Sequence, residues 1–304
     1  MTVELDESTG DAVADRVVSG VVGVFERAFP GRVHGYLLRG SYASGANIDG
    51  SDLDLCIVFQ EEFADPAEAE RARGAAASCA QLSSLPLEAL VVSEAQLQRP
   101  DNLVLALQLR LTSRPVYGGD VRGKLPALET DTYVRSVVYT PLHSYLYPKQ
   151  RAGGSLHYPL EHIDPEGEFF GFDQWRMPGP DGQDVPSTKL LVATVGWTAT
   201  ALIALTVGRY VRDKRACVAL YRQHLDDDWL PLVADVHELC RDRWRYQLPE
   251  AGAERRQLRE LCERTLGFQN HYLRRYREYQ LAEAKSDDPE RRELALHRLE
   301  QIQL

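Results

Sequence analysis

The chain has 304 residues and a formal net charge of −10 at pH 7. This length is enough for two domains, each with its own core. The acidic balance argues against tight, sequence-independent binding to nucleic acid, because such binding neutralises many phosphates with Lys and Arg. It favours a small-molecule partner.

The cysteines and the first residues indicate the compartment. The number of cysteines is odd, and they are scattered without the spacing of a disulfide framework or a zinc site. They are Cys56, Cys79, Cys217, Cys240 and Cys262. Residues 1–7 are acidic and lack the basic and apolar regions of a signal peptide. We therefore expect a cytoplasmic protein with reduced thiols.

The first part of the chain alternates between helical and strand patterns. Residues 11–29 are apolar at helical spacing and lead through Pro30 and Gly31 into the first strand. The elements expected next are a strand over 33–38, a turn at 40–41, a short helix over 42–46 and a strand over 53–59. A helix over 67–82 and a strand over 86–92 follow. The last elements expected are a helix that starts after Ser93, a helix over 101–111 and a turn over 115–119. A composition shift over 124–129 marks the expected end of this domain.

The turn after the first strand has the features of a phosphate site. Ser41 is expected at the N-terminus of a short helix, where backbone N–H groups lack partners and the helix dipole is positive. Gly40 has no Cβ, so a phosphate can approach the backbone closely. Gly40, Ser41 and Ser44 are therefore the expected nucleotide-binding residues of this segment.

Two acids in the next strand suggest a metal site. Side chains alternate along a strand, so Asp52 and Asp54 share one face while Leu53, Leu55 and Ile57 share the other. Mg²⁺ suits such a pair, because it is typically held by one or two carboxylates and completes its shell with water and phosphate oxygens. The alternative is a solvated edge strand with acids at every second position. The Gly-Ser turn upstream favours the metal site.

Together, Gly40-Ser41, a spacer and Asp52-x-Asp54 resemble the signature of the DNA polymerase β-like nucleotidyltransferase superfamily. The resemblance covers about the first third of the chain and implies an α/β (α+β) catalytic domain with a small mixed sheet. It also implies a third carboxylate on a later strand. Glu88, inside the apolar segment 86–92, is the candidate, and Glu94 is the alternative. A strand-edge glutamate without a role remains the other interpretation of Glu88.

The second part of the chain begins with a helical pattern over residues 130–147, followed by a Gly- and Pro-rich loop over 148–186. A loop this long is a lid, a binding loop or disordered, and its aromatic residues argue against disorder. Its acids are Glu161, Asp164, Glu166, Glu168 and Asp173. Acids and aromatic faces would suit a cationic, hydroxyl-bearing acceptor. Alternatively, the loop is solvated and its aromatics pin it down. His157 and His162 lack a supporting ligand pattern and are interpreted as ordinary loop residues.

Residues 190–208 are free of charge and long enough to cross a bilayer, but they are rich in Ala and Thr. We interpret them as the central buried helix of a helical domain and expect no membrane partner. Helices over 213–225, 229–244, 254–285 and 288–302 complete an α-helical bundle.

A catalytic domain over residues 1–126, followed by a helical domain over 127–304, resembles bacterial aminoglycoside adenylyltransferases, especially those acting on streptomycin and spectinomycin. Within that resemblance, Lys214 matches a lysine that holds the nucleotide phosphates after a helix-ending turn. Lys189, Arg209 and Arg215 are the alternatives. The spacing to Lys214 is about one residue longer than the family pattern, and the 148–186 loop is also longer, which leaves the acceptor open.

The predicted function is Mg²⁺-dependent transfer of AMP from ATP to a hydroxyl of a small polar acceptor, such as an aminoglycoside, with antibiotic resistance as the biological role. Asp52 and Asp54 would bind two metal ions, and Glu88 would take the acceptor proton. The alternatives are transfer to a protein or an RNA end, and a nucleotide-binding regulator without turnover. The sequence leaves the oligomeric state open.

Overall fold

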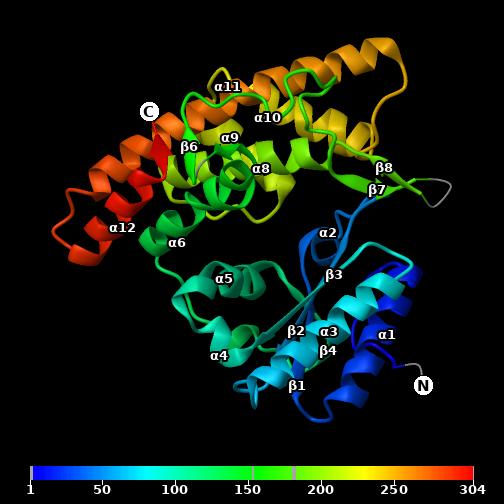
Figure 1. Ribbon diagram of the computed structural model, residues 1–304. Helices are drawn as coiled ribbons and strands as arrows, with labels where there is room; N and C mark the ends of the chain where they lie inside the picture. Colours follow the sequence, from blue (N-terminus) through cyan, green and yellow to red (C-terminus); the bar gives the residue numbers. More distant parts are fainter. Residues whose placement is uncertain (1–2, 153, 180–182, 304) are drawn as a thin grey trace. The chain divides into compact units, whose positions relative to one another are not determined.

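The computed structural model describes residues 3–152, 154–179 and 183–303 (Figure 1). The chain divides into two compact units, Met1–Leu128 and Glu129–Leu304, which we call unit 1 and unit 2. The functional division at residue 126 stays a prediction.

A mixed sheet forms the centre of unit 1. Its strands are β1 (Val33–Leu38), β2 (Leu53–Phe59), β3 (Leu87–Ser93) and β4 (Arg114–Gly118), in the order β3-β2-β1-β4. Strand β1 runs antiparallel to β2 and to β4, whereas β2 and β3 are parallel. The small mixed sheet expected for the first domain is therefore confirmed.

Strand β4 replaces the turn that was expected over residues 115–119. Pro115 and Gly118 look like turn residues in the sequence, but both lie in β4, which pairs with β1. A proline is tolerated in an edge strand because its missing N–H would otherwise face solvent. The predicted turn was wrong because the sequence does not reveal that this segment lies at a sheet edge.

Helices cover both faces of the sheet in unit 1 (Figure 1). One face packs against α1 (Ala12–Ala28) and α3 (Pro66–Leu82) through a buried cluster that includes Leu55 and Ile57. The other face packs against α4 (Glu94–Leu97) and α5 (Leu103–Thr112) through Cys56 and Val58. Strand β2 is therefore buried on both faces, which explains its nearly continuous apolar sequence. Two short 3-10 turns, η1 (Pro100–Asn102) and η2 (Arg122–Lys124), complete the unit.

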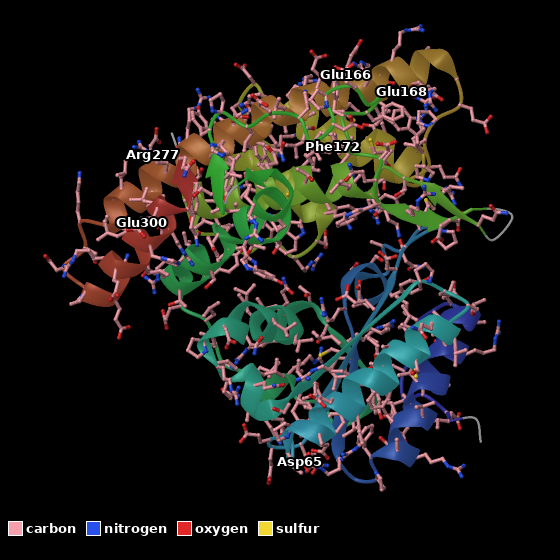
Figure 2. The ribbon with its side chains drawn as sticks, viewed as in Figure 1. Asp65, Glu166, Glu168, Phe172, Arg277 and Glu300 are labelled. Carbon is pink, nitrogen blue, oxygen red and sulfur yellow. The ribbon has the colours of Figure 1, made fainter. Side chains whose placement is uncertain are left out.

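Side chains fix where the longer helices of unit 1 begin. Asp11 accepts hydrogen bonds from the N–H groups of Val13 and Ala14, and Asp65, labelled in Figure 2, accepts one from Glu68. Ser93 caps α4, as predicted, through a reciprocal pair with Gln96. The short helix α2 (Gly40–Ser44) differs, because its N-cap residue Arg39 makes no side-chain capping bond. It also begins at Gly40, two residues before the predicted start.

Unit 2 is built around one apolar helix, α8 (Lys189–Val207). The helices of the unit are α6 (Thr130–Val137), α7 (Tyr147–Gln150), α8, α9 (Lys214–His224), α10 (Leu230–Asp235), α11 (Gly252–Glu283) and α12 (Pro289–Glu300), with π-helical turns η3 (Leu142–Leu146) and η4 (Val236–Arg243). Helix α8 contacts α6, α9, α11 and η4. By length and composition it could cross a membrane, yet 61% of its apolar window is buried inside the protein. This burial agrees with the predicted core helix.

The helix expected over residues 130–147 is interrupted. Helix α6 ends at Val137, and η3 and α7 follow. Pro141 explains the break, because a proline ring clashes with the carbonyl four residues earlier, which here belongs to Val137.

The 148–186 loop carries short strands. They are β5 (Arg151–Ala152), β6 (Ser155–His157), β7 (Arg176–Pro178) and β8 (Asp184–Pro186). Strand β6 also pairs in parallel with β9 (Ile302–Gln303), a contact the sequence did not suggest. Residues 153 and 180–182 of this loop lie outside the described residues.

Candidate active site

The turn between β1 and α2 brings Gly40 against Asp54. Gly40 has φ +59°, a left-handed conformation that side chains rarely adopt, and a Cβ built on it would stand 2.2 Å from Oδ2 of Asp54. Both the backbone and the space therefore require glycine at this position. Ser41 follows in the first turn of α2, and the Ser44 hydroxyl donates to the backbone carbonyls of Gly40 and Ser41, each over 3.2 Å. The three predicted nucleotide-binding residues of this segment thus lie together.

A row of charged residues crosses one face of the sheet beside this turn. Asp54 on β2 is the register partner of Glu88 on the parallel strand β3. The backbone N–H of Arg39, at the end of β1, donates to the carbonyl of Asp54 over 2.9 Å. Nη1 of Arg39 lies 4.0 Å from Oε1 of Glu88. The predicted third carboxylate is therefore a direct neighbour of Asp54, and sequence reasoning missed Arg39.

Asp52 stands just before β2 and is exposed. A tight loop holds the backbone in front of it: the Ser51 hydroxyl accepts a hydrogen bond from the N–H of Ile48, and the Ser51 N–H donates to the Ile48 carbonyl, both over 2.9 Å. Asp54 is half-buried, one strand alternation away on the same face. The sequence signal for this loop is the small hydroxyl residue Ser51 directly before Asp52.

These carboxylates fit a hard metal ion that arrives with a triphosphate. Among the described residues, no group of three or more His, Cys, Asp or Glu side chains is arranged to hold a metal ion by itself. Mg²⁺ needs no such cage, because one or two carboxylates and the phosphates of the substrate usually bind it. Because Gly40 has no Cβ atom, the carboxylate of Asp54 can lie directly beside the turn. Asp52 and Asp54 therefore have the donor chemistry that such an ion requires.

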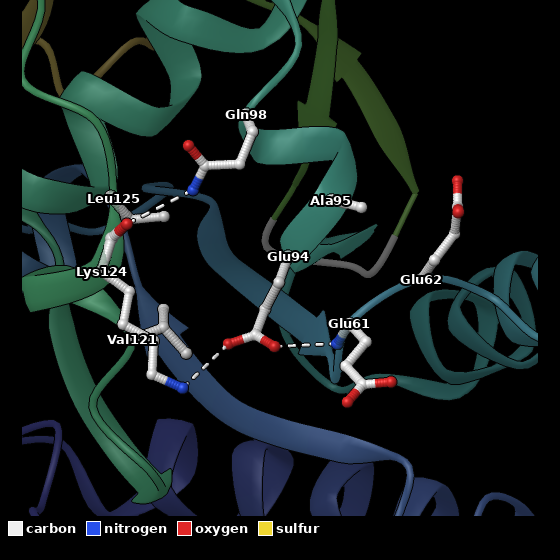
Figure 3. A pocket seen from close by; sticks show the side chains of 8 residues that line it. All are labelled: Glu61, Glu62, Glu94, Ala95, Gln98, Val121, Lys124 and Leu125. Carbon is white, nitrogen blue, oxygen red and sulfur yellow. Dashed lines mark hydrogen bonds and ion pairs between the residues drawn. The ribbon is translucent and has the colours of Figure 1, made fainter.

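Glu94, the alternative third carboxylate, lies at the other end of β3. It follows Ser93, six residues after Glu88, which corresponds to about 20 Å along a strand. Its carboxylate contacts Nδ1 of His34 at 2.8 Å. It also contacts the N–H of Glu61 at 2.8 Å and Nζ of Lys124 at 3.4 Å, as Figure 3 shows. Partial burial raises the pKa of Glu94, but these partners outweigh that effect and hold the pKa below its usual value. Glu94 is thus a structural side chain, away from Asp54.

The same end of the sheet carries an open hollow of about 390 Å³ (Figure 3). It is lined by Glu61, Glu62, Glu94, Ala95, Gln98, Val121, Lys124 and Leu125. Most of its charges are paired within unit 1, since Glu62 binds Arg99 at 2.9 Å and Glu94 binds Lys124. We therefore do not include this hollow in the candidate site formed by Asp54 and Glu88.

Lys214 is the first residue of α9 in unit 2. Asp213 caps this helix by accepting a hydrogen bond from the Ala216 N–H over 2.8 Å, and the Lys214 side chain is exposed. Arg215 follows it, while the Nζ atom of Lys189 lies 5.7 Å from the centre of the Tyr246 ring. A contact of Lys214 with the nucleotide stays a prediction.

Two aromatic residues of the long loop, Phe169 and Phe170, are covered by cations of unit 2. Phe169 and Phe170 are buried. The guanidinium carbon of Arg255 lies 5.0 Å from the Phe169 ring, and that of Arg259 lies 4.2 Å from the Phe170 ring. The His162 ring stacks on Phe170 at 4.0 Å. These contacts favour the interpretation that the aromatics pin the loop.

One of the exposed acids of the loop, Glu168, is held in an ion pair. Glu168 forms a two-armed ion pair with Arg255, and Phe172 of the same loop is buried; Figure 2 labels both loop residues. Glu161 and Glu166 are exposed. The pairing of Glu168 lowers its pKa, chiefly through the Arg255 hydrogen bond. A cationic acceptor could therefore meet only part of the predicted acidic surface.

All five cysteines are free thiols, and Cys79 is the one that is not fully buried. Burial raises the pKa of Cys56, which lies one alternation beyond Asp54 on β2, to about 12. Cys56 therefore belongs to the buried apolar cluster next to Asp54 and Glu88 and is not a nucleophile.

Residues 19–108 match the family model of the nucleotidyltransferase domain, a range that includes Gly40, Ser41, Asp52, Asp54 and Glu88. The chain carries a nucleotidyltransferase domain. This match confirms the fold and the enzyme class that the Gly-Ser and Asp-x-Asp pattern predicted. The individual site residues keep their predicted roles as predictions.

Comparison with solved structures gives a distant likeness. The chain is similar to the spectinomycin adenyltransferase AAD(9) from Enterococcus faecialis, crystallised with ATP and spectinomycin, with 11% sequence identity and a TM-score of 0.46. The alignment covers 83% of this chain and 98% of that chain. At this level the likeness says nothing of the donor or the acceptor. No curated protein sequence matches the chain.

Proposed function

We propose that this nucleotidyltransferase moves AMP from ATP to a hydroxyl of a small polar acceptor, such as an aminoglycoside, in the presence of Mg²⁺. The observation that carries the proposal is the register pairing of Asp54 with Glu88, beside the close approach of Gly40 to Asp54. This arrangement supports the proposed roles of Asp54 as a metal ligand, Glu88 as the proton acceptor and the turn at Gly40 as the phosphate site.

The reaction is a displacement at the α-phosphorus. The acceptor oxygen forms a bond to this phosphorus while the bond from the phosphorus to the oxygen that bridges to the β-phosphate breaks. Pyrophosphate leaves with the electron pair of the broken bond. The hydroxyl proton passes to Glu88, whose side chain is 64% exposed and therefore open to an acceptor.

Asp52 and Asp54 would hold the metal through carboxylate oxygens. A bound Mg²⁺ supplies positive charge that stabilises the attacking and leaving oxygens. The phosphates would lie over Gly40 and Ser41. Because α2 has only five residues, its dipole is small, and binding depends on the N–H groups of its first turn, which no side chain of Arg39 caps.

The charge of the chain supports a small acceptor. With a net charge of −10, the protein repels polyanions such as RNA. A polar or cationic small molecule does not experience this electrostatic repulsion. The resemblance to aminoglycoside adenylyltransferases, which rests on the order of the two domains and on Lys214, supports ATP as the donor and an aminoglycoside hydroxyl as the acceptor.

The test is to incubate the protein with each nucleoside triphosphate, Mg²⁺ and a panel of aminoglycosides, and separately with tRNA or with the protein alone. Pyrophosphate release and mass spectrometry of every component are the two measurements, and the Asp54→Asn variant is the control. We expect ATP-dependent pyrophosphate release and a mass gain on a small acceptor.

Two other results of this experiment would replace or overturn the proposed reaction. A mass gain on RNA or on the protein itself would replace the small acceptor with a macromolecule. ATP binding without pyrophosphate release under any condition would leave a nucleotide-binding regulator and overturn the proposed reaction.

A further inference from the structure

One cation, Arg39, shares its row with the carboxylates of Asp54 and Glu88. Its backbone N–H binds the carbonyl of Asp54, which is the register partner of Glu88. Leu37, two residues before Arg39, packs with Cys56 on the face of the sheet that α5 covers. Because side chains alternate along a strand, Arg39 projects to that same face, where Asp54 and Glu88 lie.

The link between Arg39 and Glu88 is a loose ion pair. The 4.0 Å between Nη1 and Oε1 exceeds hydrogen-bond range. Glu88 is 64% exposed, so water screens the pair and it adds little to stability. The Arg39 side chain is only 21% exposed. Its aliphatic part is therefore packed, while its guanidinium group lies beside Asp54 and Glu88. The guanidinium can therefore exchange Glu88 for another anion at small cost.

We propose that Arg39 binds the phosphoryl group that is transferred and stabilises the negative charge that develops on it. The proposal rests on the proposed function of this site. A guanidinium stays charged at every working pH and offers paired donors that match two phosphate oxygens. Gly40 and Ser41 follow Arg39 directly, so one triphosphate can meet both the guanidinium and the N–H groups of the turn.

The position of Arg39 in the row selects the α-phosphate. Glu88 must reach the attacking hydroxyl, and this hydroxyl approaches the α-phosphorus. A cation 4.0 Å from Glu88 is therefore near the reacting centre. A fixed charge aimed at the place where charge develops lowers the barrier more than it strengthens substrate binding.

The kinetic test compares Arg39→Gln and Arg39→Lys with the control Arg99→Gln. Arg99 is 53% exposed and pairs with Glu62 at the opposite end of β2. We expect R39Q to lower the turnover number about 10²- to 10³-fold, the usual cost of removing one donor to a developing charge. R39K should keep the charge but lose the paired donors, and fall between R39Q and the native protein. R99Q should retain native turnover.

A second readout separates a direct contact from a structural role. Two ATP analogues carry sulfur in place of one or the other nonbridging oxygen of the α-phosphate. If Arg39 contacts one of these oxygens, the native protein discriminates between the analogues, and R39Q discriminates less. A loss of turnover in R39Q with an unchanged ratio between the two analogues would overturn the proposal.

Calorimetry with ATP and Mg²⁺ keeps the two proposals separable. R39Q should bind ATP about threefold to tenfold more weakly than R99Q. If the native protein binds ATP but releases no pyrophosphate with any acceptor, the proposed reaction fails, while this comparison still decides whether Arg39 binds the triphosphate. Equal ATP affinities of R39Q and R99Q, or turnover of R39Q within about threefold of R99Q, would show that Arg39 has no such role.

Discussion

A Cβ atom on Gly40 would stand 2.2 Å from Oδ2 of Asp54, so the glycine sets the space available to this carboxylate. A substitution there must move either the turn or Asp54. The phosphate turn and the predicted metal ligand are therefore mechanically coupled.

Gly40→Ala should lower turnover by at least about 10²-fold, because a displaced Asp54 no longer binds metal in the productive geometry. Gly45→Ala is the matched control: Gly45 has φ +65° and open space at its Cβ position, so it bears the same backbone strain without the clash. Each variant should lose about 1–2 kcal/mol of stability. Thermal melts and pyrophosphate assays check both effects, and equal losses of activity would contradict the coupling.

Asp52→Asn and Asp54→Asn should each lower turnover by at least several hundred-fold, about 4 kcal/mol of transition-state stabilisation. The exposed Asp101, in η1, provides the control Asp101→Asn, which should remain active. Folding should survive in all three. Asp52 and Asp101 are exposed, and replacing Asp54 relieves its repulsion with Glu88, a like charge on the adjacent strand. A fall in the melting temperature of metal-free Asp54→Asn would instead indicate a structural role.

Glu88→Gln should still bind ATP with near-native affinity while transfer falls about 10²- to 10⁴-fold, because the amide cannot accept a proton. Glu94→Gln is the informative comparison. It loses charge at a carboxylate held by His34 and Lys124, so it should melt at a lower temperature and keep its turnover. Calorimetry, melts and a turnover assay on both variants test the assignment. The reverse pattern would move the proton acceptor to Glu94.

Lys214→Ala should raise the Michaelis constant for ATP about tenfold and leave that for the acceptor nearly unchanged, if the exposed ammonium group of Lys214 contacts the triphosphate. Lys285→Ala, just beyond α11, serves as the control. Should neither variant change the Michaelis constant, Lys189, Arg209 and Arg215 are the next residues to test.

The ion pair of Arg32 with Glu68 predicts a pH-dependent contribution to stability. Nε of Arg32 donates to Glu68 over 2.9 Å, and this hydrogen bond chiefly accounts for the lowered pKa of Glu68. A carboxyl whose pKa is lower in the folded state stabilises the fold above its unfolded value, near 4.5, and loses this effect as the pH falls through the folded pKa. Glu68→Gln should therefore cost about 1.5–3 kcal/mol at pH 7. Urea denaturation should show a smaller difference between variant and native protein below pH 4.

The sequence was informative where a signal is local. Residues 33–38 and 53–59 are apolar runs bounded by turn residues, and they form β1 and β2 with those bounds. Glu88 could be proposed because an acid inside an apolar segment is conspicuous. Asp54 could likewise be proposed as a metal ligand, because its acid side chain and its spacing from Gly40 can be read directly from the sequence.

What the sequence could not reveal depends on contacts between distant segments. The position of Arg39 beside Glu88 follows from the order of three strands. The covering of Phe170 by Arg259 joins residues that lie far apart in the sequence, so the loop aromatics looked available to a ligand. Strand β4 was mistaken for a turn because edge position decides whether a proline fits a sheet.

The pairing of β2 with β3 also has a consequence for how the protein is made. Residues 60–86, which include α3, separate β2 from β3 along the chain, so Asp54 can pair with Glu88 only when β3 is present and in register. A ribosome-bound chain that ends before Ser93 thus already holds Gly40, Asp52 and Asp54 but lacks a complete partner strand. The carboxylates of this row can therefore come together only once β3 has been made, and chains truncated before it would carry the motif without its geometry.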